Sequence, residues 1–377
     1  MEHSKLQDKC RGSLVGGAVG DALGYEVEFM NLASIRKRFG EKGITRYVLH
    51  DGVAQFSDDT QMTLFTLEGL MNGVIATKAG KKDEILPYIE RAYLNWYRTQ
   101  TDTPKQLPSS WMGNIRSLWA RRAPGITCLG ALENIANGFT VENNSKGCGG
   151  VMRVAPIGVF NAAHRHIYDY TDTAHLAGWA AEITHKHIAS TFASGLLATT
   201  IMNCISDKTV DQMQFFFIVT GGLVMMRESF PEHDGEWQEF DRLIRRALEL
   251  GKSDVAEEDA IRELGEGWVG DEAIAIAVFS VIRHIENFED CIVCAVNHDG
   301  DSDSTGAIAG NIIGAILGYS AIPSYYLENL EIEPILVSAA DDLCADIKVR
   351  EINLRIGDRY AKHLPSGVSE SYLIHNK

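Results

Sequence analysis

Two short acidic stretches, far apart in the chain, carry the residue types that could do chemistry. One runs from Asn297 to Gly306, with three aspartates and several hydroxyls directly before an apolar segment. The other, residues 56–60, places Ser57, Asp58 and Asp59 before a second apolar segment. Aspartate and serine in this position mark a helix N-terminus, so each stretch could simply be a helix N-terminus with several capping side chains. The same oxygens are the ligands that Mg²⁺ and Mn²⁺ prefer.

Helix geometry bears on the choice between a cap and a metal site. Adjacent residues on a regular helix point about 100° apart, so Asp58 and Asp59 would not both face one ion from a helix interior. At a helix start the backbone is not yet regular, and both carboxylates can converge. Two such helix starts that face each other would form the carboxylate-rich cage used by two-metal hydrolases.

Glycine spacing indicates which elements bring the two acidic stretches together. Glycines recur every fourth residue over 306–318 and again over 12–24, so each set lines one face of a helix. Glycine in a helix interior costs about 1 kcal/mol relative to alanine, and smooth faces let two backbones approach closely. Neither segment has the ~20 apolar residues of a membrane span. We expect the two helices, from opposite ends of the chain, to pack in the centre of one bundle.

The remaining periodicity predicts an all-α protein. A first helix is expected over Leu6–Gly24, and residues 43–49 could form a short strand. No linker or tandem repeat divides the 377 residues, so we expect one domain over 1–377, with a motif-bearing core of about 6–320 and a C-terminal helical extension of about 324–377. Further helices are expected over 58–73, 83–100, 128–138, 151–163, 173–184, 188–206, 210–228, 236–250, 271–285, 288–297, 303–318 and 334–350.

Charge and cysteine usage exclude several partners and compartments. A formal net charge of −16 argues against nucleic acid and against an anionic membrane surface. The stretch nearest to a membrane span, residues 215–226, is too short to cross a bilayer and predicts a buried helix. Seven cysteines without a framework indicate reduced thiols and a cytoplasmic protein. Cys291 and Cys294 form a lone CxxC, which predicts core packing because a structural zinc would need a second pair.

Six short motifs occur in order between about Leu14 and Gly318. They are Gly20–Gly24 with Val27–Phe29, Ser57–Thr60, Lys146–Gly158, Thr184-His185, Gly265–Val269 and Gly300–Ser304. Together they resemble the ADP-ribosylglycohydrolase family. This resemblance implies a single large orthogonal helical bundle of that family's type, with a binuclear metal site at its centre.

The resemblance also assigns residues to roles. Two Mg²⁺ or Mn²⁺ ions would be bound by Glu28, Ser57, Asp58, Asp59, Asp301, Asp303 and Ser304, with Asp303 bridging them. Asp21, Asp299 and Ser302 are weaker ligand candidates, and Asp21 is expected to anchor the loop between Gly24 and Glu28. ADP-ribose would be bound by Lys146, Gly147, Cys148, Gly149, Gly150, Val151, Met152 and His185.

From the residues alone, plainer interpretations stay open for each motif. Glu28 could be a surface glutamate, although a carboxylate among apolar neighbours is costly to bury without a partner. The glycine-rich segment 146–150 could be an ordinary turn, or it could present backbone N–H groups to a phosphate. His185 could end a helix, and Trp268 could be a core residue.

The implied reaction is hydrolysis of the N-glycosidic bond between ADP-ribose and an arginine of a modified protein. Asp58, Asp59 or Glu28 would activate the water. The biological role would be regulatory reversal of ADP-ribosylation, or immunity against an ADP-ribosylating toxin. The alternatives are an O-linked or serine ADP-ribose hydrolase, a two-metal phosphohydrolase acting on ADP-ribose-like nucleotides, and a non-catalytic ADP-ribose-binding module.

Overall fold

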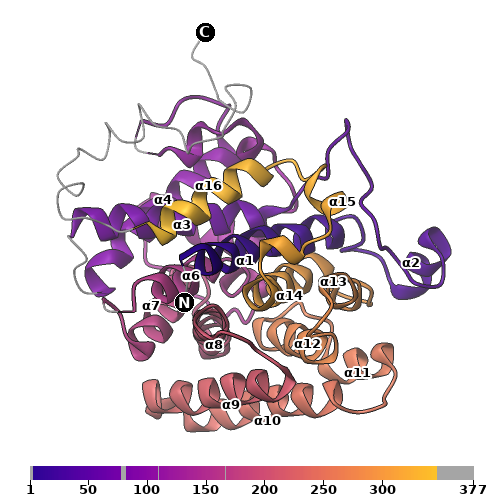
Figure 1. Cartoon of the computed structure of the whole chain (residues 1–377). Helices are drawn as coiled ribbons and strands as arrows, with labels where there is room; N and C mark the ends of the chain where they lie inside the picture. The colour runs from indigo at the N-terminus through magenta and orange to yellow at the C-terminus, as the bar shows by residue number, and fades with distance from the viewer. Residues whose placement is uncertain (1–2, 78–81, 109, 166, 346–377) are drawn as a thin grey trace.

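Two glycine-rich helices, α1 (His3–Gly24) and α14 (Ser302–Leu317), lie side by side in the middle of the molecule (Figure 1). In the computed structural model the described residues are 3–77, 82–108, 110–165 and 167–345. Around this pair α16, α6, α3, α8 and α13 all contact α1. The central position predicted for the two glycine helices is therefore confirmed.

The glycine faces of α1 and α14 pack antiparallel, backbone against backbone. A Cβ atom added to Gly20 would lie 1.9 Å from the carbonyl oxygen of Gly306, and one added to Gly24 would lie 2.2 Å from that of Ser302. Any side chain there would collide with main chain, which cannot move aside. The C-terminal end of α1 therefore meets the N-terminal end of α14. The facing pairs are Gly12 with Gly314, Gly16 with Gly310 and Gly20 with Gly306.

The close approach of these helices predicts a large stability loss in Gly310→Ala. The new Cβ would lie 2.0 Å from the carbonyl oxygen of Gly16. We expect the free energy of unfolding to fall by about 1–3 kcal/mol, the usual cost of overpacking a core. Gly221→Ala is the matched control, because a Cβ on this helical glycine meets nothing within 4 Å and should raise stability by about 0.5–1 kcal/mol. Urea unfolding of both variants checks this, and equal stability of the two would contradict the packing.

Sixteen α-helices make up the described part of the chain, and several short 3₁₀ turns link them. Helices α9 and α10 form a layer at the lower edge of Figure 1, with α8 and α12 between them and the central pair. Besides α1 and α14, the helices are α2 (Leu32–Phe39), α3 (Asp58–Ala76), α4 (Lys82–Thr101), α5 (Ile126–Ala136), α6 (Ala155–Ala163), α7 (Tyr170–Glu182), α8 (Ile188–Ser206), α9 (Gln212–Ser229), α10 (Asp234–Gly251), α11 (Glu257–Leu264), α12 (Gly270–Arg283), α13 (Phe288–Val296), α15 (Ser324–Leu327) and α16 (Glu333–Cys344).

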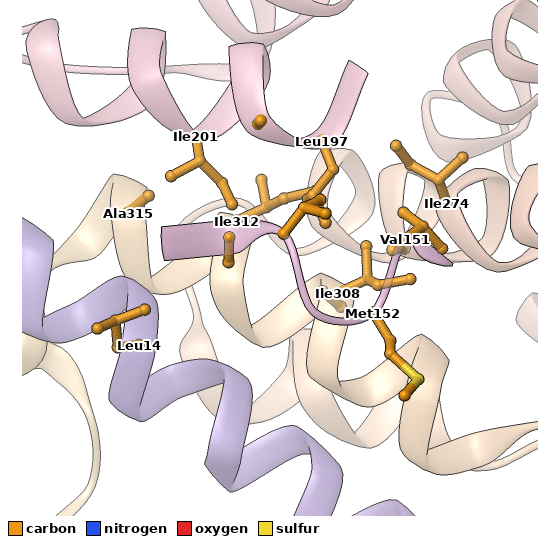
Figure 2. Close-up of a cluster of buried hydrophobic side chains, with 14 of the residues drawn as sticks. Leu14, Val151, Met152, Leu197, Ile201, Ile274, Ile308, Ile312 and Ala315 are labelled. Atoms are coloured by element: carbon orange, nitrogen blue, oxygen red, sulfur yellow. The ribbon is translucent and has the colours of Figure 1, made fainter. Parts of the chain in front are cut away.

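The core beside the central pair is built from branched aliphatic side chains. Figure 2 shows Leu14 of α1, Leu197 and Ile201 of α8, and Ile308 and Ile312 of α14 around one buried cluster. The segment that precedes α6 crosses this cluster, which fixes it against the central helices. Burial of this kind stabilises by about 25 cal/mol per Å² of apolar surface.

The strand expected over residues 43–49 is wrong. Both backbone groups of Ile44 pair with the side-chain amide of Asn297, whose Oδ1 accepts at 2.7 Å and whose Nδ2 donates at 3.0 Å. Gly43 has a positive φ of 71°, which also breaks the extended run. One asparagine therefore replaces a strand partner, and the described residues contain isolated β-bridges but no strand.

Several helix boundaries differ from the predicted ones. The helix expected over 151–163 begins at Ala155, because residues 148–154 form a 3₁₀ turn and a further turn before Pro156 opens α6. The helix expected over 334–350 ends at Cys344, and its residues 346–350 lie outside the described residues, as does most of the C-terminal extension. The short helices α2, α11 and α15 were not predicted.

Helix α8, and not the segment 215–226, is the described segment that comes nearest to a membrane span. Within the described residues it is long and apolar enough to cross a membrane, although 89% of that window is buried inside the protein. Its position against α6, α7 and α14 is that of a core helix. The segment 215–226 makes up most of α9, which buries one face and leaves Phe217 and Val224 exposed. No disulfide joins the seven cysteines, and Cys291 and Cys294 lie in the core as predicted.

Candidate metal centre and substrate cavity

The acidic start of α3 is held in place by a buried aspartate of α1. Asp21 is fully buried, and its carboxylate accepts hydrogen bonds from the backbone N–H of Ser57 at 2.8 Å and of Thr60 at 2.9 Å. Asp21 was expected to anchor the loop between Gly24 and Glu28. It anchors the N-terminus of α3 instead, and so fixes where Asp58 and Asp59 lie.

A second set of carboxylates forms where α1 ends and α14 begins. Glu28 follows the end of α1, while Asp301 and Asp303 open α14. One carboxylate oxygen from each of the three lies within 4.8 Å of the others. Because the glycine faces run antiparallel, the end of α1 at Gly24 lies against Ser302 at the start of α14. This contact explains why Glu28 and Asp301 lie close together although they are 273 residues apart in sequence.

Burial and mutual repulsion oppose ionisation of these carboxyl groups. Loss of water contact, followed by the neighbouring charges of Asp303 and Asp301, raises the pKa of Glu28 to about 10. Burial, with Asp303 next in importance, also raises the pKa of Asp59 and of Asp301 well above the usual range. The pKa of Asp58 is raised by burial too, against the lowering effect of a hydrogen bond from the Gly125 N–H.

The donor set fits a divalent cation. Oε2 of Glu28 and Oδ2 of Asp59 are buried and have no hydrogen-bond partner among the described residues. A buried carboxylate oxygen without a donor is costly, and a cation would satisfy both. The oxygens match the preference of Mg²⁺ and Mn²⁺. This chemistry goes beyond what helix caps need.

Both acidic stretches face one cavity of about 480 Å³. Glu28, Asp58, Asp59, Asp301, Asp303 and Ser304 line it. The predicted ligand Ser57 is the N-cap of α3, where its hydroxyl accepts from the Asp59 N–H, and it does not line the cavity. The weaker candidates also lie elsewhere: Asp299 accepts from the Leu32 N–H, and the Ser302 hydroxyl donates to the Gly300 carbonyl.

The glycine-rich turn forms another part of the cavity wall, in contact with the carboxylates. Gly147, Cys148, Gly149 and Met152 line the cavity, and the Cys148 thiol donates to Oδ2 of Asp301 at 2.7 Å. Three predicted substrate residues lie outside the lining: Lys146, whose ammonium lies 4.0 Å from an oxygen of Asp271, and the buried Gly150 and Val151.

The turn is fixed by the segment that carries Trp268. The N–H of Cys148 donates to the Trp268 carbonyl at 3.2 Å, and the N–H of Gly270 donates to the Lys146 carbonyl at 2.8 Å. The same segment contacts the start of α14, because the N–H of Asp301 donates to the Glu266 carbonyl at 2.8 Å. The motif Gly265–Val269 thus connects the glycine-rich turn to the start of α14.

His185 projects into the cavity from a buried polar chain. The Arg153 guanidinium donates to the Thr184 hydroxyl at 2.7 Å, and that hydroxyl lies 2.9 Å from Nδ1 of His185. Burial first, and then the Arg153 charge, lowers the pKa of His185 to about 3, so the ring is neutral. With Nδ1 accepting from Thr184, Nε2 carries the proton and faces Gly147 and Gly149. The role of Arg153 was not predicted.

Three exposed apolar side chains surround the cavity mouth. Phe29 is 77% exposed, Trp268 39% and Ile126 89%, and all line the cavity. The Phe29 and Trp268 rings stack with centroids 6.0 Å apart. Trp268 is therefore not a core residue. Sequence reasoning missed Phe29 and Ile126, although the position of Phe29 directly after the ligand candidate Glu28 was the available signal.

Comparisons with known proteins show which family the chain matches. A model of the ADP-ribosylglycohydrolase family matches residues 2–353. The chain is 25% identical to the ADP-ribosyl-dinitrogen reductase glycohydrolase of Rhodospirillum rubrum, covering 88% of this chain and 94% of that protein. It is 25% identical to ADP-ribosylarginine hydrolase Tri1 of Serratia proteamaculans, covering 91% and 81%.

More distant relatives and a solved structure belong to the same group. ADP-ribosylhydrolase ARH3 of Danio rerio is 22% identical, over 90% of this chain and 89% of that protein. A solved structure titled ADP-ribosylglycohydrolase-related protein complex aligns with a TM-score of 0.57 at 24% identity, over 90% of this chain and 98% of that one. At this identity the structural likeness shows the fold alone.

Proposed function

The chain belongs to the ADP-ribosylglycohydrolase family, and from this premise we propose that it hydrolyses the N-glycosidic bond between ADP-ribose and an arginine side chain of a modified protein. The observation that carries the proposal is the meeting of both acidic helix starts with the glycine-rich turn in one cavity. A relative named as an ADP-ribosylarginine hydrolase supports the arginine linkage, and a relative named for a modified reductase supports a protein substrate.

In this proposal two Mg²⁺ or Mn²⁺ ions are bound by Glu28, Asp58, Asp59, Asp301, Asp303 and Ser304. When bound, such ions supply Lewis-acid chemistry and neutralise the negative charge of the site. The carboxylates stabilise the oxocarbenium-like centre that forms as the guanidine leaves. Asp58, Asp59 or Glu28 accepts the proton of the attacking water as a carboxylate, the ionised form that bound cations would favour over the protonated form.

The glycine-rich turn binds the rest of ADP-ribose. The backbone N–H of Gly149 donates to the pyrophosphate, because glycine lets the phosphate approach the main chain. The N–H groups of Gly147 and Cys148 instead donate to the Ser145 hydroxyl and the Trp268 carbonyl and hold the turn in place. The neutral His185 donates from Nε2 to a hydroxyl of the distal ribose. The cavity mouth, with Phe29 and Trp268, meets the modified protein.

The orientation of His185 gives a prediction for Thr184→Val. The change removes the hydroxyl that Nδ1 faces but keeps the shape of the side chain, so both neutral tautomers become accessible. We expect kcat/KM for an ADP-ribosylated arginine peptide to fall about 10-fold, the loss of about one hydrogen bond. The buried Arg153 guanidinium also loses an acceptor, so the free energy of unfolding should fall by about 1–3 kcal/mol. Thr66→Val, a buried threonine paired with Tyr93 away from the cavity, is the control. Equal kcat/KM in both variants would contradict the role of Thr184.

The second candidate is an O-linked or serine ADP-ribose hydrolase, favoured by the relative named only as an ADP-ribosylhydrolase. The experiment compares initial rates on one peptide that carries ADP-ribose on arginine and on its serine counterpart, with Mg²⁺ present. Faster release from arginine supports the proposal, and faster release from serine supports the second candidate. Release of AMP or phosphate would instead indicate a phosphohydrolase, and binding without any turnover a non-catalytic module.

A further inference from the structure

A second group of metal-ligating side chains lies apart from the cavity. Glu257 is the first residue of α11, His284 is the C-cap of α12, and Cys294 lies in α13. One donor atom from each lies within 4.8 Å of the other two. Nε2 of His284 is 2.8 Å from Oε1 of Glu257, and the Cys294 thiol is hydrogen-bonded to the Glu257 carboxylate. Three separate helices thus converge on one point.

The donor chemistry of this group differs from that of the cavity. Among the described residues two such groups of donors occur, and the one at the cavity offers carboxylate oxygens only. The group at Glu257 offers one sulfur, one imidazole nitrogen and one oxygen, the set typical of zinc rather than of magnesium. Zinc bond lengths place neighbouring donors roughly 3.3–3.7 Å apart. Small side-chain movements from the present positions reach that spacing.

We propose that Glu257, His284 and Cys294 bind a Zn²⁺ ion, with water as the fourth ligand. On binding, the Cys294 thiol loses its proton to solvent and His284 binds as neutral imidazole. Thiolate and carboxylate together balance the charge of the ion. The nearby Arg283 guanidinium is occupied by the carbonyls of Leu250 and Val255. Glu257 is exposed, which leaves an entry path.

The ion would link α11 to the end of α12 and to α13. Helix α13 ends at Val296, directly before the segment that leads to Asp301. Of the CxxC pair, Cys291 is fully buried and is not part of the group. The pair therefore contributes one ligand rather than two, which is why a search for paired CxxC motifs overlooks the site.

Cobalt reports on this site directly, because a thiolate bound to Co²⁺ gives a charge-transfer band in the near ultraviolet. The full chain is stripped with chelator and titrated with Co²⁺. We expect a saturable band at one equivalent, which Zn²⁺ abolishes and excess Mg²⁺ leaves unchanged. Zn²⁺ should also raise the melting temperature of the stripped protein.

Cysteine variants distinguish this site from the cavity, where Cys148 contacts Asp301. The band should disappear in Cys294→Ser and persist in Cys148→Ser and Cys291→Ser. Because Cys294 is buried, the partly exposed Glu257→Gln provides a second variant, expected to weaken Co²⁺ binding at least about 10-fold. Absence of the band in the parent protein, its survival in Cys294→Ser, or its loss in Cys148→Ser alone would overturn the proposal.

Discussion

Asp303→Asn is expected to lower turnover of an ADP-ribosylated arginine substrate at least about 100-fold, in line with the several kcal/mol that a catalytic metal contributes. Asparagine is nearly isosteric with aspartate and caps a helix equally well. Asp303 is 3% exposed and belongs to the group with Glu28 and Asp301. The variant therefore loses a negative ligand without opening a cavity. Asp58→Asn and Asp59→Asn should lose less, since Asp303 is the proposed bridging ligand.

Asp299→Asn is the matched control, because it lies on the same segment but outside the metal group. Its carboxylate accepts from the Leu32 N–H, a bond that an asparagine oxygen can also accept. Steady-state hydrolysis is measured for the variants beside the parent protein, and circular dichroism checks that the helices remain. Near-parental turnover in Asp303→Asn would mean that Asp303 only accepts the hydrogen bond from the Ser304 N–H in the first turn of α14.

Removal of divalent cations is expected to abolish activity and to lower the melting temperature. Without cations, Glu28, Asp58, Asp59, Asp301 and Asp303 are left buried together, where repulsion disfavours their ionised forms. Mg²⁺ or Mn²⁺ should restore both activity and melting temperature, because the ligands in the cavity are hard oxygens.

The measurement is turnover and thermal unfolding of the chelator-treated protein before and after each cation is added. In Asp303→Asn the gain in melting temperature on adding Mg²⁺ should be much smaller than in the parent, whereas Asp299→Asn should keep it. Full activity in a metal-free preparation would contradict the metal centre.

The two glycine stripes and the two acidic helix starts are the parts of the fold that the sequence predicts best. A four-residue glycine spacing has one physical use in a soluble helix, which is close approach of another backbone, and Gly20 against Gly306 provides it. Once those helices are antiparallel, the segment after Gly24 must arrive beside Asp301. Local pattern and chain geometry together therefore suffice to bring Glu28 near the start of α14.

Other parts of the site depend on contacts that local pattern does not encode. Asn297 replaces a strand partner for Ile44, and Asp21 reaches Ser57 rather than its own loop. In each case one side chain makes two or more hydrogen bonds to a segment far away in sequence. The stacking of Phe29 on Trp268 likewise depends on how the two loops lie in space. From the sequence alone, each aromatic residue would be expected in the core.

A crystal grown with Mn²⁺ and ADP-ribose shows whether divalent cations and ADP-ribose share one cavity. The anomalous map should show Mn²⁺ within bonding distance of the carboxylates of Asp59, Asp301 and Asp303. The pyrophosphate should lie on the turn at Gly147–Gly149, with the distal ribose beside His185. Anomalous peaks confined to other parts of the molecule, or ADP-ribose bound away from these carboxylates, would contradict the account.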